Sequence, residues 1–329
     1  MEEIRSNDYS IWLVEDLESK LNLKKYSKVA ILVDENTKKH CLTLIPKFDS
    51  SIIIEISSGE KNKNLDTCSL IWNKLLKNNF DKNSVIINLG GGLICDLGGF
   101  CASSFKRGID YINLPTSLLA MVDASFGGKI GFNHNNYKNQ IGFFKNPNQV
   151  IINHKFLSTL PNEEFYSAFG EIVKHALIGD SELWKTLLKN KIQDLNIQDI
   201  ISKSIKLKNA IILNDFNEKN ERKKLNFGHT FGHAIESYYI SKGTAILHGY
   251  AVLLGILCEI EISNLSLKEK VDISNYISNN FQLPDMPKKD KLFKFIKQDK
   301  KNFSERVNFS LLNGIGNCTV DNLFKINEL

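Results

Sequence analysis

Three histidines close together in the sequence are the residues of this chain best suited to chemistry. His229 and His233 are four positions apart, and His248 follows in the same half of the chain. The i, i+4 spacing places the first two imidazoles on one face of a helix. Histidine is the commonest metal ligand near neutral pH, so this stretch indicates a metal site. Thr230 stands where a zinc protease of the H-E-x-x-H type has its general-base glutamate, which argues against that class.

A carboxylate in the same half of the chain completes a metal site. Glu171 and Lys174 are one turn apart in a stretch of helical period. Glutamate, two histidines and an open position are the ligand set of a catalytic zinc, which polarises an oxygen or activates a hydroxyl. The spacing leaves open whether His233 or His248 is the second histidine ligand. It also leaves open a simpler structure, with a surface Glu171–Lys174 ion pair and helix histidines satisfied by hydrogen bonds.

Two glycine turns suggest sites for anions. Gly90, Gly91 and Gly92 lie between a predicted strand and a helix, where backbone N–H groups can meet a dinucleotide pyrophosphate. The run departs from G-x-G-x-x-G, and the alternative is a turn that serves only packing. Asp96, one turn later, suits a ribose or an amide. The second turn covers residues 123–129, and its lysine, with the Lys-Asn pair at 138–139, suits a phosphate or carboxylate.

The elements that must position these residues change character along the chain. Apolar runs predict strands at 29–33, 51–56, 84–89, 112–114 and 150–152, alternating with helices, which implies a parallel sheet covered on both faces. Beyond residue 160 the apolar period is helical, with helices expected at 165–177, 201–213, 227–239 and 251–265. We therefore predict an α/β domain over residues 1–159 and an all-α domain over residues 160–329.

Composition narrows the class of protein. The 329 residues are 42% hydrophobic and 24% charged, which is typical of a soluble globular chain. No apolar run has membrane-spanning length, and the charged start of the chain lacks the apolar core of a signal peptide. The six cysteines form no C-x-x-C pair, as in reduced cytosolic proteins. With a net charge of only +5, we expect a cytoplasmic protein with a small anionic substrate and no nucleic-acid or membrane partner.

Taken together, the motifs resemble the 3-dehydroquinate synthase family of sugar phosphate cyclases. The resemblance is carried by five ordered blocks: GGGLICDLGGF (90–100), RGIDYINLPTSLLAMVDASFGGK (107–129), KNQIG (138–142), GEIVK (170–174) and LNFGHTFGHAIE (225–236). It runs from about Ser58 to His248 and more loosely to Lys300-Lys301. It implies a Rossmann-like NAD domain followed by an α-helical metal domain, with the active site in a cleft.

The resemblance also implies roles for individual residues. It makes Glu171, His229 and His248 the ligands of zinc or cobalt, and His233 an acid–base group at the substrate. NAD is expected to contact Glu60, Lys63, Gly91, Gly92, Asp96, Thr116, Ser117, Asp123, Lys129, Lys138, Phe156 and Thr159.

The implied substrate, 3-deoxy-D-arabino-heptulosonate 7-phosphate, carries a carboxylate and a phosphate. Lys208 and Arg222 match the carboxylate side, where a planar guanidinium binds bidentately. Lys174 matches a contact to a substrate hydroxyl, and Arg107 an arginine contributed across a homodimer interface. The phosphate side is matched by Lys129, Asn139, Asn226 and a C-terminal lysine, Lys300 or Lys301.

The implied reaction is the step of the shikimate pathway that yields 3-dehydroquinate and phosphate. NAD oxidises the substrate, phosphate leaves by β-elimination, the same cofactor returns the hydride, and an intramolecular aldol reaction closes the ring. The enzyme is thus expected to be a carbon–oxygen lyase without net redox change.

Departures from the family pattern leave alternatives open. Tyr250 replaces a usual glutamate after His248-Gly249, which bears on the residues that support His248. Milder departures are Ser117, Tyr137 and Asn220. Rival functions are a cyclase of sedoheptulose 7-phosphate or glucose 6-phosphate, a metal-dependent polyol dehydrogenase, and a nucleotide-binding module without activity. A cyclase of those sugar phosphates has no need for the carboxylate-directed cations. A polyol dehydrogenase has no need for the phosphate-directed cluster. An inactive module predicts at least one broken site residue, and we find none.

Overall fold

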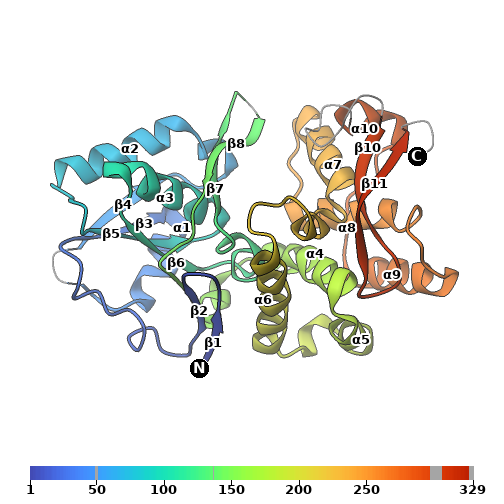
Figure 1. The fold of residues 1–329 in the computed structure, drawn as a ribbon, viewed down its shortest axis with the longest axis horizontal. Coiled ribbons are helices and arrows are strands. Elements are labelled where there is room, and N and C mark those ends of the chain that lie inside the picture. The colour runs from blue at the N-terminus through green and yellow to red at the C-terminus, as the bar shows by residue number, and fades with distance from the viewer. Residues whose placement is uncertain (49–50, 136, 297–305, 326–329) are drawn as a thin grey trace. The chain divides into compact units, whose positions relative to one another are not determined.

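The computed structural model of the chain describes residues 1–48, 51–135, 137–296 and 306–325. It divides into two compact units, Met1–Pro161 and Asn162–Leu329 (Figure 1). None of the helices in the described ranges is long and apolar enough to cross a membrane. All six cysteines are buried and free.

The N-terminal unit is built on a seven-stranded sheet in the order β1-β2-β9-β6-β5-β3-β4. Neighbouring strands run parallel except for the edge pair β1–β2. The five strands expected from apolar runs are present, and the two short strands β1 and β2 were not expected. The bounds are β1 (Glu2–Arg5), β2 (Ser10–Leu13), β3 (Val29–Asp34), β4 (Ile52–Ile56), β5 (Val85–Gly90), β6 (Asp110–Pro115) and β9 (Gln149–Ile152).

Both faces of the central strands are buried, as a parallel sheet requires. Leu32 and Ile86 pack with α2 and α3 on one face, whereas Val33 and Ile87 point to the other face and are also fully buried. Gly98 lets α3 lie directly on β5, because a Cβ there would overlap the Asn88 side chain. The helices and short turns are α1 (Glu35–His40), α2 (Leu65–Lys77), α3 (Gly92–Ser104), η1 (Leu42–Leu44), η2 (Glu60–Asn62), η3 (Phe105–Arg107), η4 (Ala120–Ala124) and η5 (His154–Thr159).

A β-hairpin, which the sequence analysis did not predict, follows the second glycine turn. Strand β7 (Lys129–His134) pairs antiparallel with β8 (Tyr137–Phe144), and Gly131 lies opposite Gly142. A Cβ on either glycine would overlap the facing backbone, so the two strands come together only because both residues lack a side chain. The hairpin carries Lys129 on β7 and the Lys-Asn pair of residues 138–139 on β8.

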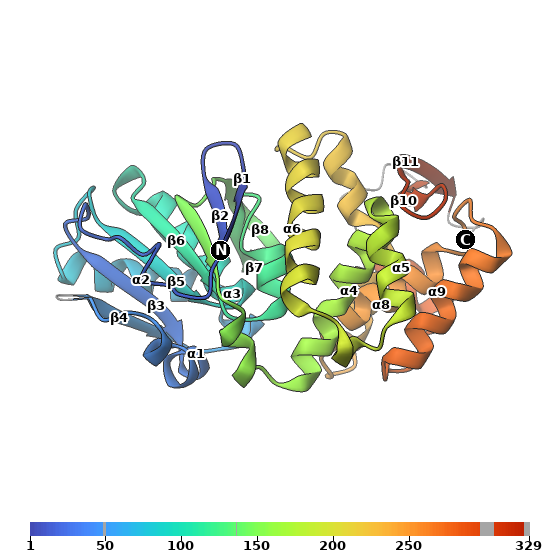
Figure 2. The ribbon, with the colours of Figure 1, turned by 90° about the horizontal axis from the view of Figure 1, so that it is seen from below.

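The C-terminal unit is helical but is not all-α. Its last described segment is an antiparallel hairpin, β10–β11, which the sequence did not predict (Figure 2). Phe309 of β10 stacks on Phe231 of α7, so the hairpin belongs to the core of this unit. The elements are α4 (Asn162–Gly179), α5 (Ser181–Lys189), η6 (Ile192–Asp194), α6 (Ile197–Asn214), η7 (Glu221–Asn226), α7 (His229–Ser241), α8 (His248–Glu259), α9 (Leu267–Asn280), α10 (Lys289–Ile296), β10 (Arg306–Leu312) and β11 (Cys318–Lys325).

Candidate active site

Glycines bring together the three helices that carry the candidate metal ligands. Gly170 of α4 meets Gly249 of α8 so closely that a Cβ on either would overlap the other helix's backbone. Gly255 of α8 meets Gly228, at the start of α7, in the same way. Three of these glycines are sequence neighbours of Glu171, His229 or His248, so the close packing of the helices fixes the positions of those side chains.

Glu171, His229 and His248 converge on one point in the C-terminal unit. Their donor atoms all lie within 4.8 Å of one another. Glu171 Oε1 is 3.3 Å from His229 Nε2 and 3.2 Å from His248 Nε2, and Glu171 is fully buried. His233 lies one turn along α7 and is half-buried, with its ring centroid 5.2 Å from that of His229. It falls outside the donor group, so the geometry favours His248 over His233 as a ligand.

The chemistry of these donors fits a bound cation. His229 Nδ1 lies 3.1 Å from the carbonyl oxygen of Phe227, which can only accept, so Nδ1 carries the hydrogen and a neutral ring leaves a lone pair on Nε2. Burial lowers the pKa of His229, against the opposing charge of Glu171, which favours that neutral ring. Two electron-rich atoms, Nε2 and the Glu171 oxygen, then face each other, and a divalent ion between them would satisfy both.

The charges around Glu171 hold it ionised. Burial works to raise its pKa, but the pKa lies well below its usual range, and the charge of the Lys174 ammonium is the largest cause that lowers it. Lys174 is itself buried and forms an ion pair with Glu171 Oε2. The simpler hypothesis of a surface ion pair is therefore wrong for these two residues. Lys174 instead places a cation beside the donor group.

Glu236 supports His248 and was missed in the sequence analysis. Burial would lower the pKa of His248, but hydrogen bonds to Glu171 and Glu236 outweigh it and raise the pKa to about 10. Glu236 Oε1 lies 3.3 Å from His248 Nδ1, so it orients the ring with Nε2 toward Glu171. Tyr250 does not take this place: its hydroxyl donates to the Glu163 carbonyl at 3.4 Å. The signal was present, because Glu236 ends the last of the five motif blocks.

Glu259 is a second buried carboxylate that sequence reasoning missed. Its oxygens accept the backbone N–H groups of Gly228 (2.6 Å), Thr230 (3.1 Å) and Phe231 (3.3 Å). The N-terminus of α7 has no side-chain cap of its own, and Glu259 supplies one from α8. It thereby holds the first turn of the helix that begins at His229.

The cations expected at the substrate carboxylate are buried in the same unit. Lys208 on α6 is 5% exposed and Arg222 in η7 is 2% exposed, and α6 packs against η7. Arg222 Nη1 donates to the Phe216 carbonyl oxygen at 2.7 Å, and Asn226 Nδ2 donates to Glu218 Oε1 at 2.9 Å. Arg222 and Asn226 thus occupy one short segment that ends just before His229.

The carboxyl edge of the parallel sheet gathers the expected nucleotide residues. The strand order reverses between β3 and β5, where α/β proteins bind ligands. Gly91 is the N-cap of α3, and no side chain of the described residues caps the start of that helix by a hydrogen bond. Burial and then the charge of Asp34 raise the pKa of the Cys41 thiol to about 11, whereas hydrogen bonds with the hydroxyls of Thr159 and Thr116 work to lower it. These four residues therefore lie close together at this edge of the sheet. Asp34 closes β3 and caps α1; it was missed, although a polar residue directly after a buried strand marks this edge.

Lys63 sits at the centre of a polar network in the N-terminal unit. Its ammonium is 2.5 Å from Asp96 Oδ2 and 2.5 Å from Asn139 Oδ1, and the residue is 4% exposed. Burial works to lower its pKa, but Asp96 outweighs burial and raises it. Glu60 accepts from Asn133 Nδ2 at 2.8 Å, which connects η2 to the same hairpin. The expected nucleotide residues Lys63 and Asp96 are thus joined to the expected phosphate residue Asn139.

The remaining expected residues differ in how far the structure positions them. Ser117 lies near Gly91, and its hydroxyl accepts the N–H of Ala120 at 3.2 Å. Asp123 is part of η4 and Phe156 is buried in η5. Three cations are exposed, Arg107 at a left-handed φ of 68° and Lys129 and Lys138 on the β7–β8 hairpin. Lys300 and Lys301 lie outside the described residues.

The fold, a parallel-sheet unit followed by a helical unit, is the fold of solved sugar phosphate cyclases. A solved 2-deoxy-scyllo-inosose synthase, complexed with carbaglucose-6-phosphate, NAD+ and Co2+, matches 99% of this chain and 97% of its own, with a TM-score of 0.84 at 22% identity. A 2-epi-5-epi-valiolone synthase from Streptomyces hygroscopicus, with NAD+ and Zn2+ bound, matches 100% and 96%, with a TM-score of 0.85 at 20% identity. At this identity the likeness shows the fold, and it confirms the predicted fold class.

Sequence comparison narrows the class to one family. The family models described as 3-dehydroquinate synthase N-terminal and C-terminal match residues 53–167 and 168–302. A 3-dehydroquinate synthase of Parabacteroides distasonis is 37% identical over 321 residues, covering 94% of this chain and 91% of that protein. The chain belongs to the 3-dehydroquinate synthase family.

Proposed function

We propose that this chain is an enzyme that converts 3-deoxy-D-arabino-heptulosonate 7-phosphate to 3-dehydroquinate and phosphate, as a lyase that needs NAD and a divalent metal. The observation that carries the proposal is the buried donor group of Glu171, His229 and His248, with Lys174 beside it. Family membership supplies the reaction, and solved cyclases of the same fold were crystallised with NAD+ and with Co2+ or Zn2+. Zn2+ and Co2+ both suit this donor set.

The residues of the C-terminal unit have separate roles in substrate binding and proton transfer in this proposal. When bound, the metal polarises substrate hydroxyl oxygens and NAD takes up and returns a hydride. Lys174 donates to a substrate hydroxyl, and His233 is available to move a proton because it is not a ligand. Lys208 and Arg222 bind the carboxylate, and Asn226 binds on the phosphate side. Since both cations are already buried, a bound carboxylate would meet them without competing water.

The N-terminal unit holds NAD in this proposal. The uncapped start of α3 at Gly91 and Gly92 receives the pyrophosphate. Asp96 lies one turn further along α3 and is already paired with Lys63, which follows η2. Residues near the reversal of strand order between β3 and β5 and residues of η5 complete the site. The lysines of the β7–β8 hairpin, Lys129 and Lys138, are directed to phosphate. The full set is Glu60, Lys63, Gly91, Gly92, Asp96, Thr116, Ser117, Asp123, Lys129, Lys138, Phe156 and Thr159.

Arg107 and the assembly state belong to the same proposal. Its exposed position on η3, at a left-handed φ, suits a side chain presented to a second copy of the chain. We infer a homodimer, located in the cytoplasm, in which each copy lends Arg107 to its partner's phosphate site. The C-terminal lysine, Lys300 or Lys301, completes that site.

The test of the proposal is phosphate release from the keto-acid phosphate with NAD at a small fraction of the substrate concentration. We expect release far in excess of NAD, no accumulation of NADH, and loss of activity after treatment with a chelator. Restoration by Zn2+ or Co2+ controls for damage during chelation. Stoichiometric NADH formation would instead show a dehydrogenase, and chelator-resistant turnover would remove the metal from the reaction.

A further inference from the structure

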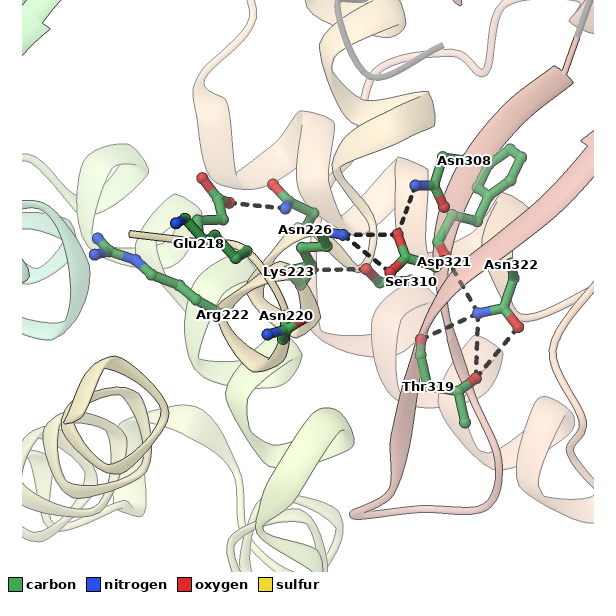
Figure 3. A network of polar contacts seen from close by, with 12 residues as sticks. Glu218, Asn220, Arg222, Lys223, Asn226, Asn308, Ser310, Thr319, Asp321 and Asn322 are labelled. Atoms are coloured by element: carbon green, nitrogen blue, oxygen red, sulfur yellow. Dashed lines mark hydrogen bonds and ion pairs between the residues drawn. The ribbon is translucent and has the colours of Figure 1, made fainter. Parts of the chain in front are cut away.

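The β10–β11 hairpin makes contacts that reach beyond its packing in the core. The matched family segments end at residue 302, so the hairpin lies beyond both of them. It packs against η7, the segment that carries Arg222 and Asn226. Figure 3 shows the polar contacts through which the two elements meet.

Lys223 is the residue that the hairpin holds. Its ammonium lies 2.9 Å from each carboxylate oxygen of Asp321 on β11. Its backbone carbonyl accepts the hydroxyl of Ser310 on β10 at 2.6 Å. One strand therefore binds the main chain of Lys223 and the other binds its side chain. A residue fixed at both ends leaves little freedom for the residue before it, which is Arg222.

The backbone and side-chain contacts of Asp321 favour its ion pair with Lys223. It sits at a left-handed φ of 59°, a conformation that few residues other than glycine adopt, and asparagine and aspartate adopt it most readily. Its Oδ1 also accepts Asn308 Nδ2 at 2.8 Å, so the carboxylate is held from β10 as well. The Lys223 and Asp321 side chains are 30% and 48% exposed, so the ion pair alone contributes modestly. The buried Ser310 hydroxyl, 5% exposed as a residue, supplies the more protected contact.

The geometry of η7 connects this clamp to the proposed substrate site. Arg222 and Lys223 extend on opposite sides of the segment, one away from the hairpin and one toward it (Figure 3). At the far end, Glu218 accepts from Asn226, which closes the segment on itself. The hairpin holds the side of η7 from which Lys223 extends. We therefore expect Arg222 and Asn226 to keep a fixed direction relative to the rest of the unit.

We propose that Ser310 and Asp321 are positioning residues, which act through Lys223 to hold Arg222 and Asn226 for substrate binding. The inference rests on the proposed function of those two residues. It assigns the terminal hairpin a part in substrate affinity that is separate from the metal ligands on α4, α7 and α8. A loosened η7 then weakens binding of the keto-acid phosphate while the metal site stays intact.

The experiment compares the wild-type chain with Ser310→Ala, Asp321→Asn and the double variant. Asparagine keeps the size of aspartate and tolerates the left-handed backbone, so Asp321→Asn removes the charge without new strain. We expect KM for the keto-acid phosphate to rise about threefold to tenfold in each single variant and further in the double variant. We expect kcat and zinc content to stay within about twofold of wild type, a margin equal to ~0.4 kcal/mol.

Thr319→Val is the matched control, because its hydroxyl bonds stay inside the hairpin, to Leu311 and Asn322. We expect it to leave KM unchanged. An unchanged KM in the double variant overturns the proposal. Equal changes in Thr319→Val overturn it too, since the hairpin would then act only through its own stability.

Hydrogen exchange tests the clamp without any activity. In the double variant we expect faster exchange of the amides of residues 221–227, with α6 unchanged. This measurement separates the clamp from the proposed function. If the wild-type chain does not turn over the substrate, the proposed function is wrong, but hydrogen exchange still tests whether Ser310 and Asp321 hold η7. Unchanged exchange in residues 221–227 contradicts the clamp whatever the substrate.

Discussion

At the scale of single residues, three buried carboxylates organise the site. Glu171 faces two imidazoles and an ammonium, Glu236 orients one of those imidazoles, and Glu259 caps the helix that begins at His229. An ionised carboxylate in a buried site is stable only with such partners. The sequence shows the histidines readily, because their spacing is local. It hides Glu236 and Glu259, whose partners lie 12 and up to 31 positions away.

Replacing Glu236 by glutamine tests its support of His248. Glutamine can present its amide to Nδ1 but no longer favours the Nδ1–H form by charge, so the ring is held less firmly. We expect zinc affinity to fall about 10- to 100-fold, measured by competition with a chromophoric chelator. Glu182→Gln, in an exposed ion pair on α5, is the matched control. Wild-type affinity in Glu236→Gln would show that His248 needs no such partner.

Asp215 gives a prediction with a defined pH dependence. Burial works to raise its pKa, but the N–H groups of Asn220, Lys219 and Arg222 outweigh burial and lower it below 3.8. A lowered folded-state pKa means that the carboxylate contributes stability above its ordinary pKa, and that this contribution is lost as pH falls through the folded value. We expect Asp215→Asn to lower the urea midpoint at pH 7 and to approach wild type below about pH 3. A gap that widens toward acid pH would contradict this.

At the scale of elements, backbone contacts between helices set the site. The strands of the parallel sheet and most helices could be predicted, because apolar runs and helical periods are local patterns. The two hairpins could not: β8 and β11 mix apolar with polar residues and stay largely exposed, so neither has the continuous buried run that marks the central strands. The expected helix over 251–265 ends early, at Glu259, where the side chain turns to cap α7.

Gly249→Ala tests whether the contact between α4 and α8 places the ligands. A Cβ there would overlap the Ser167 carbonyl oxygen, so the helices must move apart. We expect a loss of about 3 kcal/mol in stability together with weaker zinc binding, measured by thermal unfolding with and without zinc.

Gly243→Ala is the comparison for that variant. Gly243 has a φ of 77° with nothing near its missing Cβ, so alanine there costs about 1 kcal/mol of backbone strain without a clash. We expect it to keep full zinc affinity. Equal zinc affinities in the two alanine variants would show that the close approach of α4 and α8 is not needed for the site.

At the scale of the whole molecule, the chain combines a parallel sheet unit with a helical unit that holds the candidate metal donors and the two buried cations Lys208 and Arg222. Motif blocks predicted this arrangement, and family membership agrees with it. Tyr250, which raised the question of an altered substrate, leaves His248 supported by Glu236. Under the proposed function, the choice of substrate depends on Lys208 and Arg222, the two buried cations that we assign to a carboxylate.

The most direct measurement of that choice is phosphate release from three substrates in parallel, with catalytic NAD and Zn2+. We predict turnover of 3-deoxy-D-arabino-heptulosonate 7-phosphate, and none of sedoheptulose 7-phosphate or glucose 6-phosphate, because only the first has a carboxylate for Lys208 and Arg222. Preference for either sugar phosphate that lacks a carboxylate would keep the fold and the metal site but contradict the role assigned to those cations. Turnover of none of the three would contradict the assignment as a cyclase.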